Sequence, residues 1–202
     1  MRRPESLAPS LRRNASWMIV ARIAYHGCQF ATLALIAALG SPEQVGAFVL
    51  GLSASAPVFI LSSLQLSVAQ CTDRSNRFSM SDYVAVRAIA TASAFALTLI
   101  LGAWWSDDPA TRMVIACVAL SKSVESFSDI LCGRLQKHEL MHLVARSMIL
   151  RGIASAIGVA TVFPLTRSVA AAVIAYAIAW LAVVVMHDLP AALRALQTEF
   201  SS

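Results

Sequence analysis

The amino-acid sequence predicts an all-α, polytopic membrane protein built as a bundle of six transmembrane helices. Three observations support this fold class. Hydrophobic residues make up 58% of the 202-residue chain, and its mean hydropathy is +0.69. A soluble domain of this size could not bury so much apolar surface. Six apolar stretches each approach or exceed the ~20 residues that a helix needs to cross a bilayer. The connections between these stretches alternate in charge, as they do in membrane proteins.

Turn residues or interfacial aromatic residues bound the expected helices. The first helix follows a basic segment, residues 1–16, and ends before Gly40-Ser41-Pro42. Tyr83 and Trp104 flank the third helix, where aromatic belts occur. Asp107-Asp108-Pro109 precedes the fourth helix, and Pro164 follows the fifth. We therefore expect helices at 17–39, 45–64, 83–104, 112–131, 144–163 and 169–186.

The remaining connections are longer and polar, and they lie on the opposite membrane face. They comprise residues 65–82 and 132–143. The transmembrane bundle is thus expected to span 17–187, and the tail, 188–202, to include a short amphipathic helix on the inner leaflet. Within the bundle, small residues at four-residue spacing, such as Gly152-Ala156-Ala160, predict close approach of helix backbones.

Lysine and arginine are concentrated at alternate connections. The first helix is preceded by four arginines, and the polar connections and the tail carry further basic residues. The opposite connections hold Arg167 alone, with Arg112 at the edge of the fourth helix. By the positive-inside rule, both termini are cytoplasmic. The net charge of +5 therefore reports topology and contact with anionic membrane lipids, and we expect no nucleic-acid partner.

Ionisable residues inside the apolar stretches are the candidate functional residues, because charges within a bilayer are costly. They lie at similar depths in the inner half of the membrane, with Lys122 near the midplane. Lys122, Glu125 and Asp129 share one face of the fourth helix, at spacing i, i+3, i+7. The six candidate residues, charged or strongly polar, are Arg22, Gln29, Lys122, Glu125, Asp129 and Arg151.

These charges permit two interpretations. In the first, they form structural ion pairs: Arg22 and Arg151 neutralise Glu125 and Asp129, and Lys122 pairs with Glu125 within its helix. In the second, they line a water-filled cavity that opens to the cytoplasm and receives an anion, since three cations exceed two carboxylates.

A zinc-protease motif also occurs. His138-Glu139-Leu140-Met141-His142 has the form HExxH, in which two histidines one helical turn apart bind zinc and the glutamate activates water. No second motif supplies a third ligand, and the four cysteines have no CxxC spacing. We therefore expect no metal, no cofactor and no enzyme activity.

Several stretches, in order, resemble the polysaccharide-biosynthesis, or O-antigen flippase, family of the multidrug/oligosaccharidyl-lipid/polysaccharide exporter superfamily. The resemblance covers roughly residues 14–190, and its first part is the turn Leu39–Phe48. It continues through Asp82–Arg87, Lys122–Asp129, Gly133–Lys137 and Arg146–Gly152. The resemblance implies a multi-pass protein of the bacterial inner membrane that flips polyprenyl-pyrophosphate-linked oligosaccharide for lipopolysaccharide or other surface polysaccharide.

The resemblance also implies roles for the intramembrane charges. Arg22 and Arg151 would contact the pyrophosphate, since guanidinium groups suit bidentate phosphate binding. Lys122 would add a point charge. Glu125 and Asp129 would orient these cations or bind a coupling proton or sodium ion.

Family members have two lobes of six or more helices, whereas this chain supplies one. We therefore expect a homodimer or a complex with a separate second lobe, unless the chain is a truncated fragment. Other functions stay open: an organic-cation/proton antiporter-like lobe, a non-transporting accessory subunit, and an HExxH membrane zinc protease.

Overall fold

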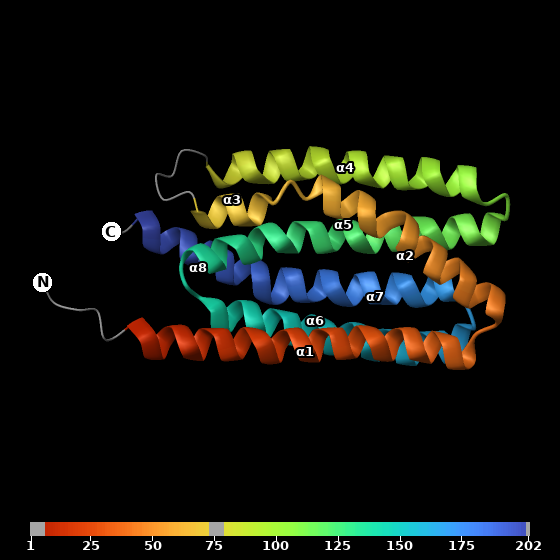
Figure 1. The fold of residues 1–202 in the computed structure, drawn as a ribbon, viewed down its shortest axis with the longest axis horizontal. Helices are drawn as coiled ribbons and strands as arrows, with labels where there is room; N and C mark the ends of the chain where they lie inside the picture. Colours follow the sequence, from red (N-terminus) through yellow and green to blue (C-terminus); the bar gives the residue numbers. More distant parts are fainter. Residues whose placement is uncertain (1–6, 73–78, 201–202) are drawn as a thin grey trace, which may run out of the picture.

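Helices account for all the regular structure in the residues that the computed structural model describes, 7–72 and 79–200. Six long helices run up and down along one axis (Figure 1). Their bounds, with those of the shorter helices, are α1 Leu7–Leu39, α2 Pro42–Ser62, α3 Leu66–Thr72, α4 Met80–Trp105, α5 Pro109–Lys137, α6 Met141–Thr166, α7 Val169–Val183, the π-helix η1 Val184–Asp188 and α8 Leu189–Phe200.

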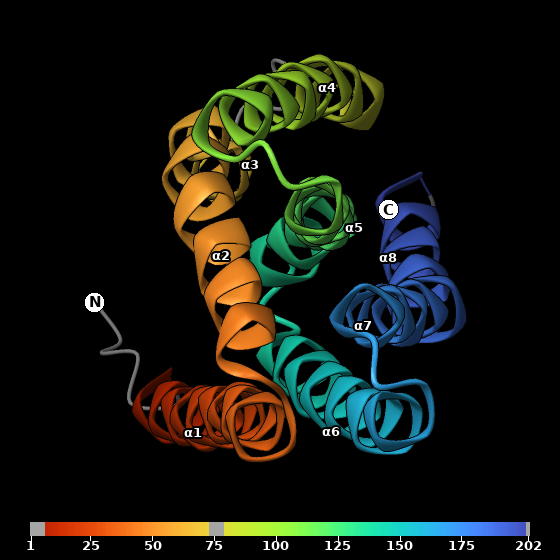
Figure 2. The same cartoon turned by 90° about the vertical axis from the view of Figure 1, so that its right-hand side faces the viewer.

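Five spans are long and apolar enough to cross a membrane: Ser16–Leu39, Pro42–Thr72, Met80–Trp105, Met141–Thr166 and Val169–Arg194. The sixth long helix, α5, carries Lys122, Glu125 and Asp129. It packs against α2, α4 and α7 along its length and against α3 near its end. Viewed along the bundle, α5 lies in the middle and α1 lies outside, next to α6 (Figure 2). The most polar of the long helices is therefore the one that neighbouring helices surround.

The helices begin earlier than the apolar stretches because polar residues cap them. Ser41 and Ser79 each form a capping box, with Gln44 and Asp82 respectively. Asp108 accepts hydrogen bonds from the first backbone amides of α5. Pro42 and Pro109 occupy the first helical turn, where the missing N–H costs nothing. Residues expected to form turns are therefore the first residues of helices.

The polar connection expected at 65–82 contains a helix. Leu64 and Gln65 adopt positive φ values of 48° and 50°, which ends α2. After this bend, α3 continues toward the same end of the bundle but is less inclined than α2 (Figure 1). Residues 73–78 lie outside the described part of the chain. Similarly, α5 extends to Lys137 because Gly133 packs directly against α3, where a Cβ would approach Ser67 Cα to 3.1 Å.

The last apolar stretch is not one α-helix. α7 ends at Val183, and one π-helical turn, η1, connects it to α8. The tail expected to be amphipathic is thus helical from Leu189 to Phe200. Pro164, expected to terminate a helix, lies inside the last turn of α6, which ends at Thr166 before Arg167 with φ 51°.

The two arginines at the end of the bundle away from the termini have structural roles. Arg167 donates from Nη1 to the carbonyl of Leu39, 3.0 Å away, and its own carbonyl accepts from Gln44. Arg112 donates to the carbonyls of Ser106 and Ala103 at the end of α4. Cations suit these positions because the carbonyls at a helix C-terminus carry partial negative charge. Both exceptions to the charge asymmetry therefore stabilise turns.

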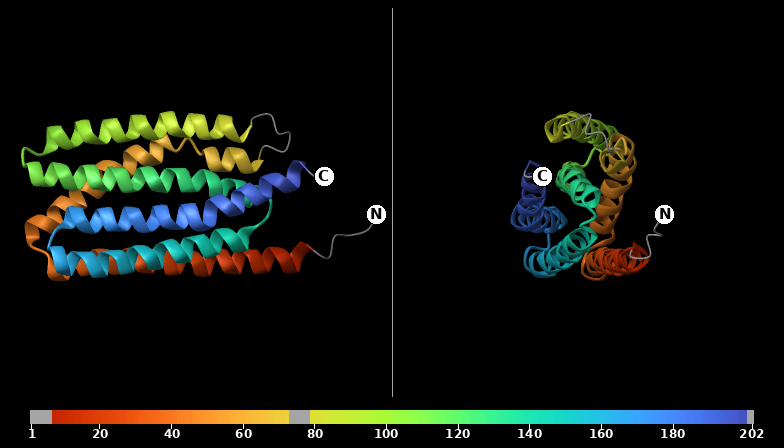
Figure 3. Two further views of the ribbon diagram at one scale, coloured as in Figure 1. Left: turned by 180° about the vertical axis from the view of Figure 1, so that it is seen from behind. Right: turned by 90° about the vertical axis from the view of Figure 1, so that its left-hand side faces the viewer.

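The described ends of the chain, in α1 and α8, lie at the same end of the bundle (Figure 3). An even number of long helices requires this arrangement. Which membrane face this end occupies remains the prediction made from the charge asymmetry.

Close packing of α1 on α6 depends on Gly152. A Cβ at this position would lie 3.3 Å from Tyr25 Cα and Cys28 Cβ. We expect Gly152→Leu to lower the free energy of unfolding by about 1–3 kcal/mol, because the larger side chain forces the helices apart. The matched control is Gly27→Leu on α1, where no atom lies within 4 Å of the added Cβ. Unfolding in mixed micelles with increasing SDS measures both, and equal losses would contradict this role of Gly152.

Candidate functional site

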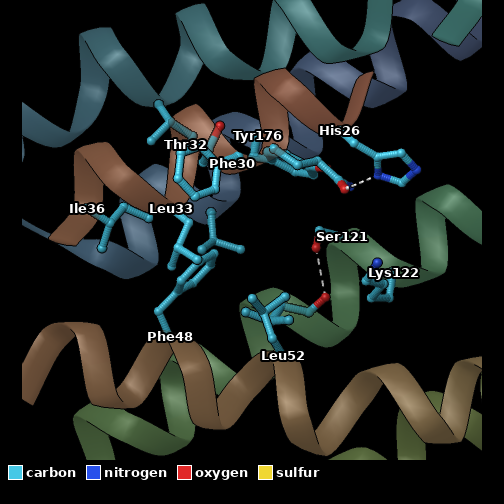
Figure 4. Close-up of a pocket in the computed structure, with 14 residues that line it drawn as sticks. His26, Phe30, Thr32, Leu33, Ile36, Phe48, Leu52, Ser121, Lys122 and Tyr176 are labelled. Atoms are coloured by element: carbon cyan, nitrogen blue, oxygen red, sulfur yellow. Dashed lines mark hydrogen bonds between the residues drawn. The ribbon is translucent and has the colours of Figure 1, made fainter. Parts of the chain in front are cut away.

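A cleft between α1 and α5 is the candidate functional site. Its first part is a cavity of about 340 Å³ toward the α1–α2 turn, with walls from α1, α2, α5, α6 and α7. In Figure 4, Phe48 and Leu52 project from α2 toward Leu33 of α1, while His26 and Lys122 lie at the opposite end of the cavity. This half of the cleft is mainly apolar, because Ile36, Val118, Val159 and Val173 also line it.

The second part of the cleft is a charged cavity of about 240 Å³ toward the termini. Arg22, Glu125, Asp129 and Arg151 contribute to its walls. The two cavities are adjacent, since His26 lines both. Lys122 in the apolar part also bonds Glu125 in the charged part, with 2.6 Å between Nζ and Oε2. All five charged residues singled out in the sequence therefore line the two adjacent cavities of this cleft.

An aromatic wall lies beside the charged cavity. Trp180 stacks on Tyr176 at a centroid distance of 6.0 Å and meets the edge of Tyr25, also at 6.0 Å. Gln29 donates a 2.6 Å hydrogen bond to the Tyr25 hydroxyl and lies 3.3 Å from His26 Nδ1. These side chains combine apolar faces with polar tips, which suits a ligand of mixed polarity.

The expected ion pairs are observed only in part. Lys122 pairs with Glu125, as the i, i+3 spacing indicates. Asp129 pairs with neither Arg22 nor Arg151; its partner is Arg87 of α4, at 3.1 Å. Arg87 also donates to the carbonyls of Ser126 at 2.8 Å and Ser63 at 3.1 Å. The physical reason is that α4 packs on α5, whereas α1 is separated from α5 by the cleft.

Arg151 is buried, with 4% of its surface exposed. Its guanidinium donates to Ser128 Oγ, to the Ser147 carbonyl and to Cys132 Sγ, and it lies 4.8 Å from the Trp180 ring centroid. These contacts use three of its five N–H donors. They leave little capacity for the pyrophosphate contact that the resemblance implied.

Asp188 completes this buried cluster. Its carboxylate is fully buried and accepts a 2.9 Å hydrogen bond from Ser128 Oγ, so Ser128 bridges Asp188 and Arg151. His187 Nδ1 lies 3.1 Å from the other carboxylate oxygen. Asp188 belongs to the π-helical turn, which directs it into the bundle. The sequence offered no signal for this role, since Asp188 follows the last apolar stretch.

Arg22 differs from the other cations of the cleft. It is exposed, and among the described residues it makes no ion pair or hydrogen bond. Lys122 is held by Glu125, and Arg151 by its own cluster. Arg22 is therefore the cation of the cleft best able to bind an external anion.

The HExxH stretch does not form a helical zinc motif. α5 ends at Lys137, Glu139 has a positive φ of 57°, and α6 begins at Met141. His138 and His142 consequently belong to different segments, not to successive turns of one helix. Within residues 7–72 and 79–200, no group of three His, Cys, Asp or Glu side chains could hold a metal ion.

No family model matches the chain, and no solved structure matches it significantly. The chain is similar to the capsular polysaccharide biosynthesis protein CapF of Staphylococcus aureus, with 28% identity over 146 residues. The matched region covers 72% of this chain and 36% of CapF, so the chain spans little more than a third of that relative's length. The long apolar helices indicate a membrane protein.

Proposed function

We propose that the chain is one lobe of a transporter that flips polyprenyl-pyrophosphate-linked oligosaccharide across the bacterial inner membrane. The observation that carries the proposal is the two-part cleft, in which a charged cavity adjoins an apolar one. A lipid-linked sugar has a charged pyrophosphate next to a long hydrocarbon chain, and it needs both environments. The similarity to CapF supports polysaccharide biosynthesis as the setting.

Arg22 is assigned to the pyrophosphate. Its free guanidinium can form two parallel hydrogen bonds to phosphate oxygens. Lys122 adds positive charge at the boundary between the two cavities, and Glu125 holds it there. Arg151 acts as a positioning residue, because it fixes α5, α6 and the end of α7 around the charged cavity. Glu125 and Asp129 are the acids available to a coupling proton or sodium ion.

A second lobe would complete the transporter. Both described ends of the chain lie at one end of the bundle, so a second copy could sit beside it in the same membrane orientation. Alternating access would follow from one lobe rocking against the other. The partner is either a second copy of this chain or a separate protein lobe.

The test is Arg22→Ala in cells that depend on this chain for surface polysaccharide. Loss of one charge-assisted phosphate contact weakens binding by about tenfold or more, so surface polysaccharide should fall steeply while the amount of inserted protein stays unchanged. Arg22→Lys should restore part of the export. Arg112→Ala, which removes a cation at the other end of the bundle, is the matched control. Normal export by Arg22→Ala would contradict the proposal.

A second candidate function is a non-transporting accessory subunit. Native mass spectrometry from nanodiscs separates the two functions. Two lobes with a bound polyprenyl phosphate support the transporter, and a single 21.6 kDa chain with bulk phospholipid supports the accessory subunit. Cation antiport is disfavoured, because Arg22, Lys122 and Arg151 outnumber the two acids of the cleft.

A further inference from the structure

A separate cavity of about 490 Å³ lies at the end of the bundle that holds the termini. Four basic residues line it: His138, Arg146, His187 and Arg194. They come from the α5–α6 turn, from α6, from η1 and from α8, which converge at this end (Figure 1). The remaining walls are apolar and include Leu140, Leu143 and Met186. None of these residues lines the cleft between α1 and α5.

Of the acidic residues close to the basic cavity, Asp188 contacts one of the four basic lining residues, His187. Among the described residues that line it, none is acidic. Asp188, the neighbour of His187, is fully buried, and its carboxylate faces Ser128 and His187. Glu139 is exposed and lies outside the cavity wall. The cavity therefore presents an excess of positive charge.

The start of α6 adds to this positive field. Leu140 and Leu143, in its first turn, are part of the cavity wall. The N-cap Leu140 offers no side-chain hydrogen bond, and the first turn has no acidic residue. By contrast, Ser41, Asp108 and Ser168 cap the starts of α2, α5 and α7. The uncapped amides and the positive end of the α6 dipole favour a bound anion.

We propose that this basic cavity binds a phosphate-bearing anion, with Arg146 and Arg194 as the principal donors. Arginine forks match phosphate oxygens, and histidines add further N–H donors. Met186, Leu189 and Leu193 are exposed beside the cavity, at 80%, 40% and 49%. Such apolar surface suits contact with acyl chains, so the headgroup of an anionic phospholipid is the favoured source of the phosphate.

The test measures lipid retention by native mass spectrometry after reconstitution in phosphatidylglycerol or in phosphatidylcholine. The wild-type chain should retain one phosphatidylglycerol, and Arg146→Ala with Arg194→Ala should reduce that retention by about tenfold. Arg112→Gln with Arg167→Gln, which also removes two positive charges but at the opposite end, should retain it fully. Equal retention of both lipids, or no loss in the double variant, would overturn the proposal.

A second pair of variants avoids any doubt about folding, because Met186 is exposed at the cavity rim. Met186→Glu should weaken retention and Met186→Lys should strengthen it; identical retention by the two would contradict an anion site. In detergent, displacement of the lipid by millimolar glycerol phosphate would show that the phosphate alone is recognised. Binding of glycerol phosphate without lipid retention would identify a soluble phosphate ester as the source.

Discussion

Replacing Arg151 by methionine should lower the free energy of unfolding by about 3–5 kcal/mol, because it removes the arginine cation from a buried network that contains the Asp188 carboxylate. Methionine fills most of the space of the arginine stem, so the effect is mainly electrostatic. Asp188, fully buried, would keep Ser128 and His187 as partners but lose the cation that Ser128 bridges to it. Titration with SDS in mixed micelles, followed by tryptophan fluorescence, measures this loss.

A double-mutant cycle tests the cause. Asp188→Asn alone should also destabilise the bundle, and Arg151→Met combined with Asp188→Asn should cost less than the sum of the two. The expected coupling energy is about 1–3 kcal/mol, the range found for residues in one hydrogen-bonded network. Strict additivity would show that Ser128 does not link these groups energetically.

This prediction also separates stability from transport. Arg151 variants should lose surface polysaccharide together with folded protein. Arg22 is exposed and unpaired within the described residues. Arg22 variants should therefore lose export of surface polysaccharide while the protein stays inserted in the membrane. Two arginines that the sequence places at similar depth thus have different expected phenotypes.

Replacing Arg87 by methionine should lower the free energy of unfolding by about 2–4 kcal/mol. Arg87 is 2% exposed and joins three segments: it bonds Ser63 at the α2–α3 break, Ser126 on α5 and the Asp129 carboxylate. The effect is smaller than for Arg151 because the Asp129 side chain is 51% exposed. Its loss leaves the Leu66 amide, 3.1 Å away, as the remaining hydrogen-bond donor to the Ser63 carbonyl where the helix is interrupted.

Hydrogen exchange locates the effect. Amides of α3, residues 66–72, should exchange faster in Arg87→Met, whereas those of α7 should not change. In Arg87→Lys, the α3 amides should exchange at a rate between those of the wild type and Arg87→Met. A single ammonium group can hold Asp129 but cannot reach both carbonyls at once. If Arg87→Lys and Arg87→Met lose equal stability, the carbonyl contacts matter more than the ion pair.

Properties that depend on position along one helix could be predicted from the sequence. Hydropathy located the long helices, and the rise per residue placed Arg22, Lys122, Glu125, Asp129 and Arg151 at depths that share a cleft. The Lys122–Glu125 pair followed from spacing within α5. These inferences need no knowledge of how the helices pack.

Properties that depend on rotation and packing could not be predicted. The partner of Asp129 is Arg87, since α4 and not α1 lies against that face of α5. Arg87 stands in the first turns of an apolar stretch, and no spacing within the sequence identifies it as the partner of Asp129. Asp188 lies beyond the last apolar stretch, and only the π-helical turn shows that it points inward.

That turn sets the relative phase of α7 and α8. In η1 the amide of Leu189 bonds the carbonyl of Val184, five residues back, so this turn holds one residue more than an α-helical turn. One residue corresponds to about 100° of rotation about a helix axis. Deleting a residue such as Val185 would rotate α8 by that angle relative to α7. The extra residue therefore allows the continuous helical segment α7–η1–α8 to orient two faces independently. The face of α7 packs against the bundle, and the face of α8 can turn toward the environment outside it.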